Sequence, residues 1–160
     1  MDTTRTTVRE LTDIPDTLRG LVSIDADAVD VFTLTAPDAG HYTPEQWARC
    51  AFEQVAGRKG QLMWRLLLRL RLRTNPRNIA GWIVDGRGDG WLRLIASGPS
   101  RTGQLVVAVD GEEVSLLTAV RHDRPRAERT WQRLSPKHKT VAPRLLSIAH
   151  TRLARGLPNG

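Results

Sequence analysis

The side chain with the clearest chemical capacity is His138, which lies near the start of a predicted C-terminal helix. On a helical wheel it falls within an apolar stripe. The stripe consists of Val141, Ala142, Leu145, Ala149 and Leu153. An imidazole can donate or accept a hydrogen bond, or change its charge near neutral pH. His138 is therefore either a histidine that hydrogen-bonds a neighbouring loop or backbone carbonyl, or a polar group that points into a ligand cavity. General acid/base catalysis is a third alternative.

Three tryptophans and a threonine are the other polar groups in apolar surroundings. Thr118 shares a predicted strand face with Val114, Leu116 and Val120, so we expect its hydroxyl to point inward. Each tryptophan carries an N–H that needs a partner when buried, although plain packing is the simpler interpretation of each ring. A mostly apolar cavity with a few polar groups is typical of a small-molecule site. The candidate ligand-binding residues are Trp82, Trp91, Thr118, Trp131, His138, Val141 and Leu145.

Motifs for other chemistry do not appear in the sequence. It contains no P-loop, no G-x-G-x-x-G after a strand and no metal-binding spacing of Cys and His. We also find no Ser-His-Asp order with a recognisable nucleophile and no paired inward carboxylates. The sequence therefore predicts no cofactor and no metal, and leaves the catalytic residues unassigned. An enzyme that uses His138 as general acid/base on a carbonyl substrate stays an alternative.

The elements that would position these residues follow from turn and capping signals. Thr43, Pro44 and Gln46 form a capping-box signature that begins a helix over about 43–56. A second helix is expected over about 60–72, ended by Pro76. Strands are predicted over about 28–35, 90–97, 103–110 and 113–122, and a further strand in "AGWIVD" ends at about residue 85. A short helix over about 126–133 and a long one over about 137–155 complete the chain, separated by a cap at Ser135.

This order predicts an α+β fold. An antiparallel sheet of about five strands would pack on the long C-terminal α-helix, with two short helices between strands 1 and 2. We expect one domain over residues 27–156, a flexible or loosely packed segment over 1–26 and a frayed tail over 157–160. The single cysteine and the absence of an apolar leader predict a cytoplasmic protein.

The positive charge of the chain is concentrated in two blocks. Residues 54–84 carry seven basic and no acidic side chains, and residues 124–160 carry nine and one. The alternative function is therefore binding to nucleic acid or to a membrane surface. The basic helices 60–72 and 126–155 would form the contact. For residues 58–73 we favour a core helix with a charged rim. The second apolar side of this helix consists of Trp64 and Leu68, and it is a candidate contact site for a partner or for a second copy of the chain.

Several stretches resemble an uncharacterised bacterial family of small START-like (SRPBCC, helix-grip) domains. They are "TPEQWARCAFE" from 43, "MWRLLLRLR" from 63, "GW" at 81–82, "LLTAVRH" from 116 and "WQRLSPKHKTVAPRLLSIA" from 131. The similarity spans about residues 28–152, and its P-x-H before the last helix is the most specific part. It implies a curved antiparallel sheet that grips the C-terminal helix around an apolar cavity. An apolar, lipid-like or polyketide-like small molecule is then the expected ligand.

Overall fold

A computed structural model describes residues 6–73 and 75–156. Its strands are β1 (Thr7–Glu10), β2 (Ala28–Thr35), β3 (Ile83–Gly88), β4 (Trp91–Ser97), β5 (Arg101–Asp110) and β6 (Glu113–His122). Its α-helices are α1 (Asp16–Arg19), α2 (Pro44–Arg49), α3 (Gly57–Leu62) and α4 (Pro125–Ala154). Short 3-10 or π-helical segments are η1 (Ala39–His41), η2 (Cys50–Val55) and η3 (Met63–Leu67).

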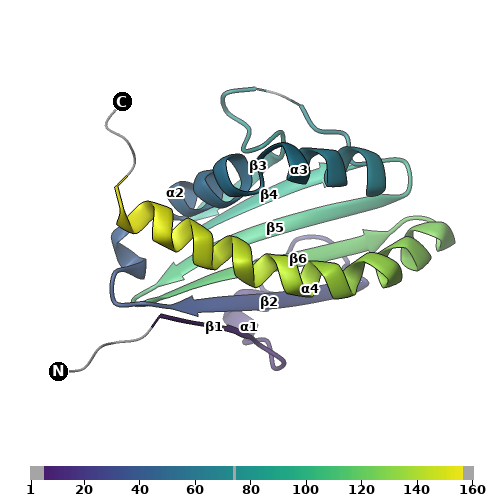
Figure 1. Ribbon diagram of the computed structural model, residues 1–160. Coiled ribbons are helices and arrows are strands. Elements are labelled where there is room, and N and C mark those ends of the chain that lie inside the picture. The colour runs from purple at the N-terminus through teal and green to yellow at the C-terminus, as the bar shows by residue number, and fades with distance from the viewer. Residues whose placement is uncertain (1–5, 74, 157–160) are drawn as a thin grey trace.

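The strands form one antiparallel sheet in the order β1-β2-β6-β5-β4-β3, and α4 lies across one face of it (Figure 1). The predicted α+β fold, with a terminal helix on the sheet and short helices between its first long strand and the meander, is confirmed. The sheet has six described strands where about five were expected, because β1 adds an edge strand beside β2. None of the helices in the described part of the chain is both long and apolar enough to cross a membrane.

Successive side chains of each strand point to opposite faces of the sheet, so each face packs in an apolar core of its own. On β2, Phe32 and Leu34 belong to the large core under α4 and the helices, while Val31 belongs to a smaller core on the opposite face. The smaller core is covered by residues 11–26, whose apolar side chains pack against Val31, Val106 and Leu117. Residues 1–26 were expected to form a flexible or loosely packed segment. The structure places β1 and α1 there, because both faces of the sheet must be covered.

The helical run from α2 to η3 begins where it was predicted, with Thr43 accepting from the Gln46 backbone in a capping box. It ends earlier than residue 72, because the chain after η3 is non-helical: Arg71 N donates to the Ser97 carbonyl at 2.9 Å. Leu70 and Leu72 are buried whereas the arginines between and beside them are exposed. This alternation in "RLRLR" has the period of extended backbone, so the helix prediction was wrong for these residues.

The predicted break at Ser135 and Pro136 was also wrong, because α4 is continuous from Pro125 to Ala154. Both Pro136 and Pro143 lie inside it. Each removes a backbone hydrogen bond and bends the helix, and Figure 1 shows α4 as a bent helix. Packing compensates for the backbone hydrogen bonds that the two prolines remove. The side chains buried against the core are Ala142, Leu146, Ala149 and Leu153.

Polar contacts fix both edges of α4 to the body of the protein. Lys139 Nζ lies 3.1 Å from Glu10 of β1. His150 Nε2 lies 2.7 Å from Asp38 Oδ1, and its ring stacks on Trp47. The hydrogen bond with His150 lowers the pKa of the Asp38 carboxyl below its usual range. These contacts join α4 to β1 and to the residue that precedes η1.

Candidate functional site

A small, largely enclosed pocket lies between the sheet, the N-terminal half of α4 and residues 63–70. It holds about 60 Å³ of free space, room for about two water molecules. The strands contribute Arg101, Gly103, Gln104, Leu105, Thr118 and Val120. Opposite them lie Met63, Trp64, Leu68, Leu70, Trp82, Trp131, Leu134 and His138. Most of these side chains are apolar, so each polar group among them stands out.

The register of β5 and β6 brings the strand residues together. Arg101 and Gly103 are two apart on β5 and so face the same side, and Gly103 pairs with Val120 across the sheet. Gly103 has no side chain to occupy the space above it, and the Trp82 ring lies there: a Cβ on Gly103 would come 3.3 Å from that ring. The absence of a side chain at Gly103 is thus what allows Trp82 to reach the sheet.

Arg101 is the most unusual member of the pocket, because its side chain is only 3% exposed. Its Nη2 donates to the Ala127 carbonyl at 2.8 Å, but Nε and Nη1 have no hydrogen-bond partner in the described structure. Burial lowers the pKa of the guanidinium. A buried charge without a counter-charge is costly, so Arg101 needs an explanation.

Two neighbouring polar atoms are also buried without a partner among the described residues. They are the Trp82 Nε1–H and the Thr118 hydroxyl, both on residues that line the same pocket. Buried polar groups in folded proteins are nearly always hydrogen-bonded, and exceptions indicate a missing ligand, ion or water. Three such residues around one space give the pocket several unused hydrogen-bond donors.

His138 faces the pocket from α4 and is held by a carboxylate. Its Nε2 lies 3.1 Å from Asp30 Oδ1, and the Asp30 side chain is almost buried. The Trp131 ring centroid lies 5.4 Å from that of the imidazole. The partner is thus a side chain of β2, whereas a loop or a backbone carbonyl was one of the expected alternatives. Asp30 interrupts an apolar strand, and that interruption was the available signal in the sequence.

The seven candidate residues divide into two groups. Trp82, Thr118, Trp131 and His138 all line the pocket. Trp91 does not: it projects from the opposite face of β4, where the Arg93 guanidinium lies 5.5 Å from its ring. Val141 and Leu145 are half-buried on α4 and are not among the lining residues. Leu146, next to Leu145, is the residue that enters the core.

Arg101 was missed because it follows Pro99 and Ser100 and so seemed to belong to the turn between β4 and β5. Its place at the first position of β5, opposite His122 of β6, became visible only with the strand register. Within the described residues, no three His, Cys, Asp or Glu side chains gather closely enough to hold a metal ion.

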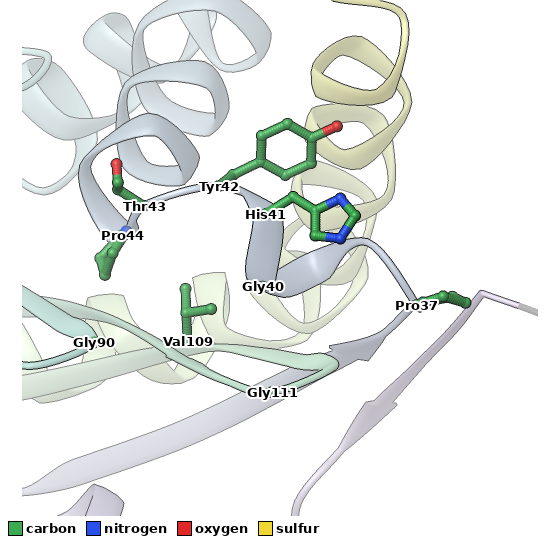
Figure 2. A pocket seen from close by; sticks show the side chains of 9 residues that line it. All are labelled: Pro37, Gly40, His41, Tyr42, Thr43, Pro44, Gly90, Val109 and Gly111. Carbon is green, nitrogen blue, oxygen red and sulfur yellow. The ribbon is translucent and has the colours of Figure 1, made fainter.

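A second hollow of about 480 Å³ lies near the Asp110-Gly111 hairpin and is open to solvent. Figure 2 shows its lining side chains spread apart around the loop that leads into α2, with Tyr42 and His41 on the far side of that loop from Val109. Gly40 approaches Gly111 so closely here that a Cβ would collide with the Gly111 carbonyl. No lining residue of this hollow has a buried polar atom left without a partner in the described structure. It is therefore larger than the enclosed pocket but chemically less specific.

Comparison of the sequence with models of known protein families and with curated proteins finds no match. The function must therefore be inferred from the chemistry of the enclosed pocket.

Proposed function

We propose that this protein binds a small molecule with an apolar body in the pocket between the sheet and α4. The observation that carries the proposal is the group of unpartnered polar atoms on Trp82, Arg101 and Thr118 within a mostly apolar wall. A core that only served stability would have no reason to bury these atoms unpaired. A ligand site needs such groups, because they orient the ligand and select it.

The size of the pocket constrains how a ligand enters. Sites for drug-sized ligands enclose about 300–1,000 Å³, whereas this one encloses about 60 Å³. As it stands it accommodates only a group of a few heavy atoms. A longer ligand therefore displaces the segment that covers the pocket, residues 63–70.

Features of that covering segment support such a displacement. It contains the π-helical η3, a geometry found frequently at functional sites. Arg69, which follows, has a positive φ of 51°, an unfavourable conformation for a residue with a side chain. Met63 is unbranched and adapts easily to a changed neighbour. Displacing this segment therefore costs less free energy than displacing a regular helix.

The arrangement is also compatible with the START-like resemblance of the sequence. A six-stranded antiparallel sheet with a C-terminal helix across it and short helices between β2 and β3 resembles a helix grip. In that fold the ligand lies beneath the terminal helix, which is where Trp131 and His138 face the pocket. This similarity supports the site but does not identify a reaction.

A pair of variants on α4 tests the proposal. Leu134 lines the pocket, and Leu134→Trp would fill it; Ile148, which is 44% exposed on the same helix, gives the control Ile148→Trp. Unbranched decanoate and 1-decanol are titrated into the delipidated full chain by calorimetry. The proposal expects binding to the natural protein and to the control, and loss of binding in Leu134→Trp. Absence of binding to the natural protein, or equal binding to all three, would contradict it.

A second candidate function is attachment to an anionic membrane surface through residues 58–65. Leu62 is 59% exposed there, and the neighbouring Arg58, Lys59 and Arg65 are exposed as well. An apolar side chain among basic ones is typical of a helix that lies at a membrane interface. Co-sedimentation with vesicles that contain anionic lipid tests this candidate, with Leu62→Ser and neutral vesicles as controls. Binding to RNA in place of vesicles would instead indicate a nucleic-acid partner.

A further inference from the structure

We propose that the ligand of this pocket is a carboxylate, and that Arg101 receives its charged group. The inference rests on the proposed function and specifies its ligand class. The pocket would then hold the acid group against β5 and β6 and the apolar chain beneath Met63, Leu68 and Leu134.

No acidic side chain of the described structure compensates the charge of Arg101. Asp30 is engaged by His138 at 3.1 Å. Asp27 accepts from the His122 backbone N–H, and Asp123 pairs with Arg121 at 2.9 Å. These three acids are thus engaged elsewhere, and the hydrogen-bond partner of Arg101 among the described residues is a neutral carbonyl.

The unpartnered nitrogens of Arg101 determine which kind of group would fit the pocket. Nε carries one N–H and Nη1 carries two, and each can donate to a carboxylate oxygen. Hydrogen bonds between an arginine and a carboxylate are charge-assisted and about twice as strong as neutral ones. The other unpartnered groups, the Trp82 N–H and the Thr118 hydroxyl, are also able to donate. The pocket therefore offers several donors and one positive charge.

The charge of the ligand distinguishes a carboxylate from other hydrogen-bond acceptors. A phosphate monoester carries about two negative charges near neutral pH, and Arg101 is the one cationic side chain among the lining residues apart from the titratable His138. A neutral alcohol would leave the guanidinium charge uncompensated. A monocarboxylate matches the single positive charge of Arg101.

The test compares an acid and an alcohol of equal chain length. Decanoate and 1-decanol are titrated by calorimetry into the delipidated full chain, into Arg101→Met and into the control Arg121→Met, which removes an arginine from the opposite face of the adjacent strand. We expect the natural protein and the control to prefer the acid by about tenfold to a hundredfold, the range of one charged hydrogen bond. In Arg101→Met that preference disappears, while the affinity for decanol changes less than about twofold.

The natural protein also tests the inference without any variant, through pH. Protonation of decanoate removes the charge that Arg101 would bind, so its affinity must fall towards that of decanol as pH decreases through the pKa of the acid. Equal affinity for acid and alcohol in the natural protein at neutral pH would overturn the carboxylate but leave small-molecule binding intact. If neither compound binds, both proposals fail together. If Arg101→Met keeps the preference for the acid, Arg101 is not its receptor.

Discussion

Replacing Arg101 with methionine should make the ligand-free protein more stable, because the natural side chain buries an uncompensated charge. Burial of an ion costs several kcal/mol in real proteins, and Arg101 is only 3% exposed, with Nε and Nη1 unpartnered among the residues that the structure describes. The substitution loses the hydrogen bond to the Ala127 carbonyl, worth about 1.5–3 kcal/mol when the donor is charged. Methionine keeps most of the volume and adapts to the apolar wall.

The balance predicts a free energy of unfolding that rises by about 1–3 kcal/mol in Arg101→Met. For a chain of this size, that corresponds to a melting temperature higher by about 2–10 °C. Urea unfolding of delipidated protein, followed by circular dichroism, measures the change, with Arg121→Met as the control that is expected to shift little. A decrease of about 1 kcal/mol or more in Arg101→Met would refute the reasoning. It would mean that Arg101 is fully satisfied in the ligand-free state and has a structural role.

Three further predictions concern individual contacts. Thr118→Val should raise the free energy of unfolding by about 1 kcal/mol, measured by urea unfolding, because it replaces an unpartnered buried hydroxyl with a methyl group. Gly81→Ala should lower it by more than about 1 kcal/mol, since Gly81 has a φ of 85° and a Cβ would lie 2.7 Å from that of Leu72. The Asp38–His150 contact should weaken in acid: the lowered pKa of Asp38 means that its stabilisation is complete above the ordinary value of 3.8 and is lost as pH falls through the folded-state pKa. Unfolding curves between about pH 5 and pH 3 should therefore show a smaller loss of stability in Asp38→Asn than in the natural protein.

The parts of the fold that the sequence predicted well are those with a local chemical signal. The capping box at Thr43 and the Asp110-Gly111 turn each involve neighbouring residues, and both lie where the structure has a helix start and a hairpin. The bounds of β2, β4 and β6 match their predicted ranges within one residue. Local backbone preferences and the packed fold agree at these positions.

Predictions failed where distant contacts override a local signal. Ser135 and Pro136 are a sound helix start in isolation, yet α4 is continuous through them, with Ala127 buried before the predicted break and Ala142 buried after it. Residues 11–26 have no clear period, and they are ordered by contact with the far face of the sheet, where Arg93 Nη1 donates to the Leu21 carbonyl. Neither contact can be inferred from residues close in sequence.

The same distinction explains the site. Thr118 and His138 were recognised because each interrupts an apolar face of its own element. Arg101 lies at the start of β5 beside a turn, so its burial depends on the cross-strand register with β6 and on Ala127 of α4. Trp91 lies outside the pocket, and the face of β4 from which it projects depends on the same strand register.

The most direct test of small-molecule binding beneath α4 is a high-resolution crystal structure of the full chain grown with decanoate. We expect the acid in the enclosed pocket, with a carboxylate oxygen about 2.7–2.9 Å from Nε or Nη1 of Arg101 and residues 63–70 displaced from the position they have here. Ordered water on both nitrogens, an unchanged pocket and no bound acid would contradict it.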